Sequence, residues 1–288
     1  MELERTFKEA GMPEYTFKSI LADSAIAEKI ILSDIDAVSF TGSVETGMRI
    51  AELAGKNLKK FVLELGGSDP FIVLDDADIE LAAQCAVTSR MMNGGQSCIA
   101  AKRFIVESSV LDEFTSRFVK ITENLKIGDP LDPNTDVGPL VRESQIKRMQ
   151  EFVEDAVSKG AKILTGGNRV PGNGFFFQPT VLANVNHSML VLNEEIFGPI
   201  APIIEVQNKD EAVMEANRTN FGLCASIWSR GEAEGLARRI QSGSVFINRI
   251  VSSDPRLPFG GVKKSGVGRE LSRYGLLEFT NIKSIVKN

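Results

Sequence analysis

Hydrophobic and polar residues alternate between two periods along the first 65 residues. Helical patterns cover "LERTFKEAG", "ADSAIAEKIILS" and "VETGMRIAELAGK", and strand patterns cover "AVSFTGS" and "FVLEL". Helices and strands that alternate in this way are typical of a parallel α/β layer, in which the helices cover the sheet. The pattern therefore predicts an α/β fold for this part of the chain.

The same alternation continues to about residue 250. "FIVLDD" and "RFIVE" are strand-like, and the helix predicted between them runs over 79–92 with Asp78 as its N-cap. Further on, we predict helices over "VLDEFTSRFVKITENL", "RESQIKRMQEFVEDAVSKGAKIL", "KDEAVMEANRTN" and "EAEGLARRIQSG", and strands over "FFFQPTVL", "IAPIIEV", "CASIWS" and "SVFIN". This is a second α/β unit. A segment rich in Gly, Pro and Ser, 251–268, separates it from a strand-like end, "LEFTNIKSIVKN".

The charge balance changes the range of possible partners. The 288 residues include 33 basic and 38 acidic side chains, a net charge of −5, with no polybasic run. Nucleic acid and anionic membranes are therefore poor candidates for partners. No apolar stretch approaches the length of a membrane span, and the start "MELERTFKEAG" lacks a secretory h-region, so we expect a cytoplasmic protein.

Cysteine and histidine are scarce. Cys85, Cys98 and Cys224 lie far apart and without C-x-x-C spacing, which argues against a disulfide framework and a thiolate metal site. The single histidine, His187, lies in a polar loop. Because Ser/His/Asp or Cys/His catalysis would have to depend on it, a nucleophile in this chain is expected to use a carboxylate as its base. We predict no metal site.

Cys98 is the best candidate nucleophile. It lies in "NGGQSCIAAKR", a loop of small residues between a helix and a strand, with Lys102 and Arg103 as its nearest cations in sequence. A lone cysteine is more often a buried packing residue. The glycines favour an accessible thiol here, whereas Cys85 and Cys224 lie among apolar residues and are predicted to pack in the core.

Glu64 is the best candidate base. It ends the buried-looking strand "FVLEL", where a carboxylate is either an ion-pair partner or a group whose pKa is raised toward neutrality. The two glycines that follow it would allow a tight turn and a close ligand.

Three further glycine-containing stretches have both a functional and a plain interpretation. "FTGSVETG" could present helix N-terminal amides to a phosphate, or could be only a turn and a cap. "NEEIFGP" could be a solvated acidic pair with one core aromatic, and "DPRLPFGGVKKSGVGRE" could be a connection between domains.

These motifs together resemble the aldehyde dehydrogenase superfamily. "FTGSVETG", "LELGGSDPFIVLDDAD", "NGGQSCIAAKR", "NEEIFGPI", "TNFGLCASIWS" and "LPFGGVKKSGVGRE" occur in that family's order and spacing. The last motif and "NGGQSCIAAKRFIV" are most similar to succinate semialdehyde dehydrogenases. The resemblance implies an α/β fold of the aldehyde dehydrogenase type, with part of a Rossmann-type cofactor domain in 1–65, a catalytic domain in 66–268, and an oligomerisation strand in 269–288.

The resemblance also implies roles for individual residues. Cys98 would be the nucleophile, and Glu64 would be the base that activates water on a thioester. NAD or NADP would be the cofactor, and a small aldehyde, such as succinate semialdehyde, the substrate. The cofactor would contact Gly42, Ser43, Gly47, Leu65, Glu195 and Phe197.

The sequence also departs from the family. Relative to full-length members, more than a third is absent before residue 1, including an oxyanion-hole Asn and a ribose-contacting Lys. Met92 stands where some succinate semialdehyde enzymes carry an arginine, so Ser253 and Arg256 are weaker candidates for binding a substrate carboxylate. The expected assembly is a homo-oligomer. Two alternatives stay open: a non-catalytic remnant that acts by assembly, and a cofactor-free esterase.

Overall fold

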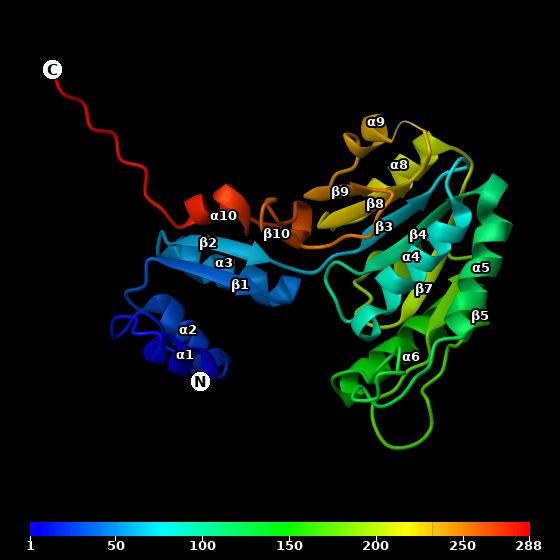
Figure 1. Ribbon diagram of the computed structural model, residues 1–288, viewed down its shortest axis with the longest axis horizontal. Coiled ribbons are helices and arrows are strands. Elements are labelled where there is room, and N and C mark those ends of the chain that lie inside the picture. Colours follow the sequence, from blue (N-terminus) through cyan, green and yellow to red (C-terminus); the bar gives the residue numbers. More distant parts are fainter. Residues whose placement is uncertain (232) are drawn as a thin grey trace.

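The structure, a computed structural model, describes residues 1–231 and 233–288 and contains two separate β-sheets (Figure 1). The larger sheet has seven strands in the order β5-β6-β7-β4-β3-β8-β9, and the smaller has three in the order β1-β2-β10. The chain passes from the small sheet to the large one directly after β2 and returns near its C-terminal end. The predicted α/β fold is confirmed.

The seven-stranded sheet is parallel except at one edge, where β5 runs antiparallel to β6. Its strands are β3 (Asp69–Val73), β4 (Ala101–Glu107), β5 (Lys162–Thr165), β6 (Thr180–Ala183), β7 (Ile200–Val206), β8 (Cys224–Trp228) and β9 (Ser244–Ile247). Every residue of β3, β4 and β8 is buried, as expected for central strands of a parallel sheet covered on both faces.

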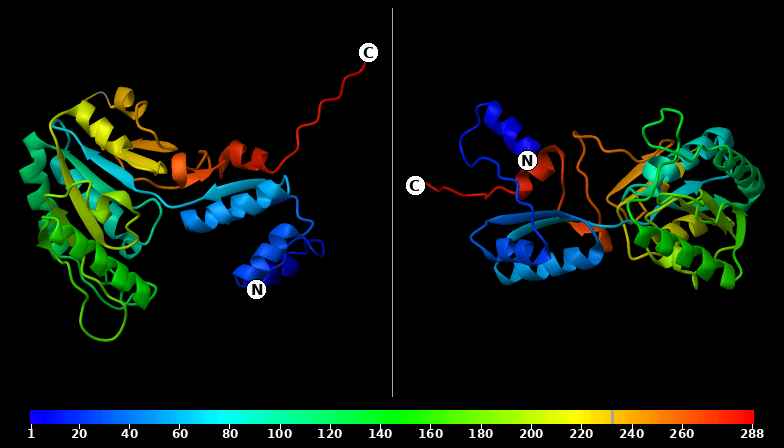
Figure 2. Two further views of the ribbon diagram at one scale, coloured as in Figure 1. Left: turned by 180° about the vertical axis from the view of Figure 1, so that it is seen from behind. Right: turned by 90° about the horizontal axis from the view of Figure 1, so that it is seen from below.

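Alternate residues of the central strands enter two different cores. In β4, Phe104 and Val106 pack on one face with α4 (Ile79–Met91) and α5 (Leu111–Glu123). Ile105 points to the other face, toward α6, α7 and α8, which span Glu143–Ser158, Leu190–Asn193 and Lys209–Asn217. This two-residue period is the ordinary geometry of a strand, and Figure 2 shows the helices on either side of the sheet.

The three-stranded sheet combines two segments that are distant in sequence. β1 (Ala37–Thr41) and β2 (Lys60–Glu64) are parallel, and the two-residue β10 (Gly266–Val267) pairs antiparallel with β2. The helices α2 (Ser24–Leu32) and α3 (Val44–Lys56) pack against this sheet and share a small core with it. Position 266 lies in the segment predicted to belong to the second unit, and its glycine-rich sequence gave no strand signal.

Most predicted elements are confirmed, including α3 over the whole of "VETGMRIAELAGK" and Asp78 as the N-cap of α4. Several expectations were wrong. Of the helix predicted over "EAEGLARRIQSG", whose first residue, 232, lies outside the described residues, only Glu234–Ala237 forms a helix (α9), and the strand predicted over "FFFQPTVL" begins only at Thr180. The helix predicted to reach Leu164 ends at Ser158, because Gly160 adopts φ +99 and the chain then enters β5. The strand expected in "LEFTNIKSIVKN" is absent from residues 279–288, which extend away from the body after α10 (Ser272–Glu278) and have no neighbouring strand to pair with (Figure 1).

The remaining short elements lie at loops and ends. They are α1 (Glu2–Glu9), α9 (Glu234–Ala237), η1 (Met92–Gly95), η2 (Ser108–Val110) and η3 (Lys263–Ser265). Among residues 1–231 and 233–288, no helix combines the length and the apolar character that crossing a membrane requires.

Candidate active site

Cys98 lies in a tight loop between α4 and β4. Three consecutive residues before it, Asn93, Gly94 and Gly95, have φ of 54°, 63° and 74°. This left-handed run is easy for glycine and tolerable for asparagine, which explains the sequence "NGG". The Cys98 side chain is only partly buried, although burial still raises the pKa of its thiol.

Two side chains hold this loop in place. Gln96 donates to the carbonyl oxygens of Asn93 at 3.0 Å and Pro139 at 3.3 Å, and it accepts from the Val141 N–H at 2.9 Å. The fully buried Arg90 donates to carbonyl oxygens on both sides of the site. These belong to Gly95 (2.7 Å), Ala101 (2.9 Å), Ile196 (3.2 Å) and Gly198 (2.5 Å).

Glu64 is buried at the carboxyl end of β2 with only 4% of its surface exposed. Among the residues the structure describes, neither of its carboxylate oxygens has a hydrogen-bond partner. Its pKa is raised to about 8, chiefly by burial and also by the negative charge of the neighbouring Glu270, while Arg269 acts in the opposite direction. A carboxyl with this pKa can exchange protons near neutral pH, as a general base must.

The glycines that follow Glu64 bring its strand end against the Cys98 loop. A Cβ on Gly67 would lie 2.9 Å from the Cys98 carbonyl oxygen, and one on Gly66 would lie 2.2 Å from a Glu195 carboxylate oxygen. A side chain at Gly67 would press on the backbone of the Cys98 loop, whereas at Gly66 it would only have to displace the end of the Glu195 side chain. The "LGG" turn thus joins the strand of Glu64, the loop of Cys98 and the loop of Glu195.

The N-terminus of α3 is a suitable place for a phosphate. Gly42 and Ser43 are exposed there, and Ser43 Oγ accepts from the Thr46 N–H at 3.3 Å as the N-cap. Gly42 donates its N–H to the Glu64 carbonyl oxygen at 3.1 Å, which ties this turn to the base. Gly47 lets α3 pack closely on Leu65, since a Cβ there would lie 2.4 Å from a Leu65 methyl carbon. These residues fit a dinucleotide whose phosphates face the helix end.

Glu195 and Phe197 lie on the other side of the Cys98 loop. A Glu195 oxygen accepts from the Gly67 N–H at 3.0 Å and lies 3.5 Å from the Lys102 ammonium. Phe197 lines a pocket of about 730 Å³ together with the loop residues Asn93 and Gln96. The glycine turn that follows Glu64 thus contacts both the Cys98 loop and Glu195.

Ser253 and Arg256 lie on the loop between β9 and β10, whose Val251 packs in one small apolar cluster with Cys98. Both are exposed, and the Arg256 side chain donates to Asp254, with a shortest distance of 2.6 Å. This pairing with Arg256 lowers the pKa of Asp254. Arg256 would therefore have to leave Asp254 before it could bind a substrate carboxylate.

The other two cysteines differ in surroundings. Cys224 is 1% exposed in β8, and burial raises its thiol pKa far above the ordinary range. Cys85 is partly buried against the α4–α5 core, and its pKa is also raised by burial. Burial raises the pKa of the Cys98 thiol as well, so the pKa direction alone does not distinguish it from the other two cysteines.

Lys102 and Asp69 are buried charged groups beside Cys98, and the sequence analysis gave them no role. A signal was present: "AAKRFIVE" places two charges at the start of a buried strand, and "GGSDPFIV" places a carboxylate in another. Charged residues are almost never fully buried without a partner, so each marks a specific contact.

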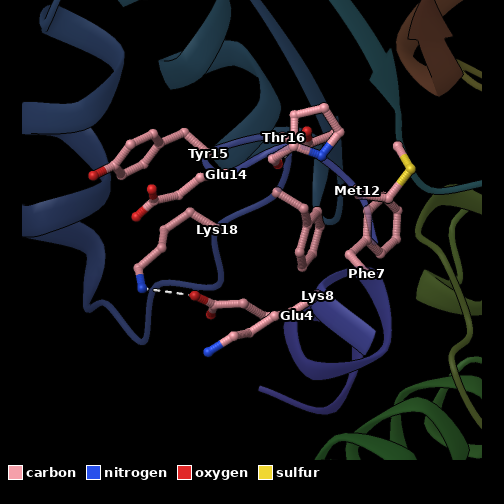
Figure 3. A pocket seen from close by; sticks show the side chains of 10 residues that line it. Glu4, Phe7, Lys8, Met12, Glu14, Tyr15, Thr16 and Lys18 are labelled. Carbon is pink, nitrogen blue, oxygen red and sulfur yellow. Dashed lines mark hydrogen bonds and ion pairs between the residues drawn. The ribbon is translucent and has the colours of Figure 1, made fainter. Parts of the chain in front are cut away.

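Two other pockets contain neither Cys98 nor Glu64. One, of about 460 Å³, lies between α1 and the chain that follows it, where Lys18 pairs with Glu4 (Figure 3). Another, of about 620 Å³, is mainly apolar and lies between α2, β1 and α3. The residues described form no cluster of three or more His, Cys, Asp or Glu side chains suited to a metal ion.

Comparisons with known proteins agree with this geometry. Residues 1–285 match the aldehyde dehydrogenase family. The chain is 47% identical over 280 residues to a succinate-semialdehyde dehydrogenase [NADP(+)] 1 of Mycobacterium bovis, covering 96% of this chain and 61% of that protein. It is 46% identical to the succinate semialdehyde dehydrogenase [NAD(P)+] Sad of Escherichia coli, covering 99% and 63%.

A solved structure of Gox0499, described for its cofactor and substrate selection, superimposes with a TM-score of 0.97. The two share 40% identity, and the match covers 100% of this chain and 64% of that one. The chain therefore spans a little over three fifths of the length of the proteins it matches.

Proposed function

Because this chain belongs to the aldehyde dehydrogenase family, we propose that it oxidises an aldehyde to a carboxylic acid with NAD or NADP. The observation that carries the proposal is the packing of the Cys98 loop against the turn that follows the buried, unpartnered Glu64. The relatives named above are NADP- or NAD(P)-dependent succinate semialdehyde dehydrogenases, which supports the reaction class and the cofactor.

Each catalytic residue has one task in this proposal. The Cys98 thiolate attacks the aldehyde carbon and forms a C–S bond, and the acyl group is afterwards held on the sulfur as a thioester. The nicotinamide, when bound, supplies the hydride acceptor. Glu64 takes a proton from water, whose oxygen attacks the thioester carbon, and the C–S bond breaks to release the acid and restore the thiol.

The cofactor is proposed to lie between the two sheets' facing loops. Gly42 and Ser43 would bind its phosphates at the start of α3, where backbone N–H groups and the helix dipole favour negative charge. Gly47 and Leu65 would form the closely packed surface on which the cofactor lies. Glu195 would contact the nicotinamide ribose, and Phe197 the nicotinamide ring.

Succinate semialdehyde is the proposed substrate, by similarity to the relatives. Ser253 and Arg256 stay the candidates for its carboxylate. Arg256→Ala should then raise KM for succinate semialdehyde, while an uncharged aldehyde of similar length should be unaffected. Equal effects on both aldehydes would remove Arg256 from the substrate site.

The decisive measurement is nicotinamide reduction by this chain with succinate semialdehyde and each of NAD and NADP. Cys98→Ala serves as the blank, and Cys85→Ala as the matched control that should keep full activity. Reduction that requires Cys98 supports the proposal. Absence of reduction by protein with a native circular dichroism spectrum would refute it for this chain and favour a non-catalytic role in assembly.

A parallel assay with an activated ester and no nicotinamide tests the esterase alternative. Ester hydrolysis that needs Cys98 and Glu64, without any aldehyde oxidation, would replace the proposed dehydrogenase by a cofactor-free esterase. Hydrolysis alongside oxidation is expected of the dehydrogenase, since both reactions share the thioester.

A homo-oligomer and a cytoplasmic location belong to the same proposal. The C-terminal residues carry three exposed apolar side chains, Ile282, Ile285 and Val286, with 94%, 86% and 88% exposure. We propose that this segment pairs with another copy of the chain. Light scattering should show an oligomer that is lost when residues 280–288 are removed, and a monomer in the full chain would contradict this.

A further inference from the structure

Lys102 places a buried ammonium group inside the loop of the nucleophile. Its side chain is 1% exposed, and it donates to the carbonyl oxygens of Cys98 (2.8 Å), Ser97 (3.0 Å) and Ala100 (3.3 Å). A buried charge is costly unless it is paired and hydrogen-bonded, so this cation indicates a specific task. All three hydrogen bonds hold the short chain segment that carries the thiol.

The same ammonium also faces two carboxylates. Its Nζ lies 3.5 Å from a Glu195 oxygen that is itself held by the Gly67 N–H. The fully buried Asp69 accepts from the Cys224 N–H at 3.1 Å, while its second oxygen has no partner among the described residues. Burial lowers the pKa of Lys102, and the charges of Asp69 and Glu195 raise it.

The charges around the Cys98 sulfur have opposing effects. Burial raises the thiol pKa most, the positive charge of Lys102 lowers it, and the negative charges of Asp69 and Glu195 raise it. The Ile99 N–H also lowers it. Cys224, which packs in the same cluster, is uncharged at neutral pH because burial raises its own pKa. Lys102 is therefore the charge with the largest effect on this thiol among the described groups, and it opposes the effect of burial.

We propose that Lys102 is a positioning residue for Cys98. Its ammonium group fixes the loop that carries the nucleophile, and it makes the stability of the Cys98 thiolate depend on the charge of Glu195. The inference rests on the proposed role of Cys98 as nucleophile. If Lys102 acts in this way, a group that binds Glu195 and weakens its pairing with Lys102 should strengthen the stabilisation of the Cys98 thiolate by the lysine charge.

The test measures the rate at which iodoacetamide alkylates Cys98 between pH 7 and pH 10, without aldehyde or nicotinamide. The background is a Cys85→Ala/Cys224→Ala chain, so that one thiol reports. Lys102→Met should slow alkylation about five- to tenfold at pH 8 and displace the pH profile upward by about one unit, because the thiolate fraction falls tenfold per unit of pKa.

Lys263→Met is the matched control. Lys263 also donates to two backbone carbonyl oxygens, those of Asn217 (2.9 Å) and Thr219 (3.1 Å), but it is not among the charges with the largest effects on the Cys98 pKa. Its alkylation profile should stay within about twofold of the parent chain. A Lys102→Met protein that is folded and keeps the parent profile overturns the inference.

Glu195→Gln gives an independent measurement if Lys102→Met fails to fold. Removing this negative charge should speed alkylation several-fold at pH 8 and lower the apparent thiol pKa. An unchanged rate in folded Glu195→Gln would refute the link between Glu195 and Cys98. The two proposals can fail separately. If the chain reduces no nicotinamide but shows the predicted shifts in alkylation, the proposed function is refuted and the effect of Lys102 on Cys98 is supported. If the chain reduces nicotinamide but the alkylation profiles are unchanged, only the proposed role of Lys102 is refuted.

Discussion

The two sheets contribute to the site in different ways. The seven-stranded sheet is buried on both faces, with aromatic residues such as Phe71, Phe104 and Trp228 fully enclosed. The three-stranded sheet has a core of five buried residues, Ile31, Ile50, Leu53, Leu63 and Leu65. The large sheet supports Cys98, and the small sheet supplies Glu64 and the cap of α3.

This difference suggests that the two sheets hold their site residues with different rigidity. A nucleophile held in a deeply buried frame keeps a fixed position, whereas a base on a smaller, less enclosed sheet depends on fewer contacts. The "LGG" turn is the link between them, since its glycines touch both the Cys98 loop and Glu195. We expect the two regions to respond differently to substitutions of the same kind.

Phe104→Ala should give the largest effect on stability. Phe104 is 0% exposed and packs in tilted pairs against Phe71 and Phe118, with ring centroids 5.5 Å and 4.9 Å away. Removing a buried phenylalanine typically costs about 3–5 kcal/mol, because the cavity collapses only in part. Urea unfolding should show this loss in the free energy of unfolding. A loss below about 1 kcal/mol would contradict the tight packing of this face.

Glu64→Gln should change how stability depends on pH. The folded pKa of about 8 lies above the usual value of 4.5, so the folded chain holds a proton that the unfolded chain releases. Wild-type stability from this group is full below pH 4.5 and is lost as the pH rises toward 8. Because one unit corresponds to about 1.4 kcal/mol, the variant should gain up to about 4 kcal/mol over wild type between pH 5 and pH 8.

Chemical denaturation at several pH values checks this, with Glu270→Gln as a companion. Glu270 raises the Glu64 pKa, so its neutralisation should reduce the pH dependence without abolishing it. Parallel pH curves for wild type and Glu64→Gln would mean that Glu64 is ionised in the folded chain.

Leu53→Ala tests the small core. Leu53 is 6% exposed on α3 and packs with Ile50 and Leu63. The expected loss is about 2–3 kcal/mol, at the lower end for leucine, because a small cluster at the surface can close over the deleted atoms. Hydrogen exchange should increase in β1, β2 and α3 and stay unchanged in β3 and β4. Equal increases in both sheets would show that they unfold together.

The elements that the sequence predicted well have strong local signals. α3 matches its pattern because Ser43 caps it and its apolar residues recur at helical spacing. β10 gave no such signal: its two residues form a strand only because β2 offers a free edge. The C-terminal strand failed for the opposite reason, since a strand-like sequence without a partner stays unpaired.

The site followed a similar rule. Cys98 and Glu64 could be proposed from the sequence because their glycine neighbours predict a loop and a turn. The contacts of Lys102 with the Cys98 loop and with Glu195 join segments that lie 93 positions apart in sequence, 195 minus 102, and only the packed structure shows them. Arg90 is a similar case, since its carbonyl partners come from two loops.

Substitutions at the two helix N-caps should have the smallest effects on stability, and they compare the unfolding of the small sheet with that of the large sheet. Ser43 accepts from the Thr46 N–H at 3.3 Å in the small unit, and Asp78 accepts from the Leu81 N–H at 3.2 Å in the large one. Replacing either by alanine should cost about 1 kcal/mol, because one helix N–H loses its partner.

If the two units unfold separately, Ser43→Ala shifts only the transition of the small unit and Asp78→Ala only that of the large one. Pyrophosphate should then stabilise the Ser43 unit alone, because an anion at the start of α3 uses the same free N–H groups. A single transition displaced equally by both substitutions would show instead that the Gly66–Gly67 turn couples the two sheets into one cooperative unit.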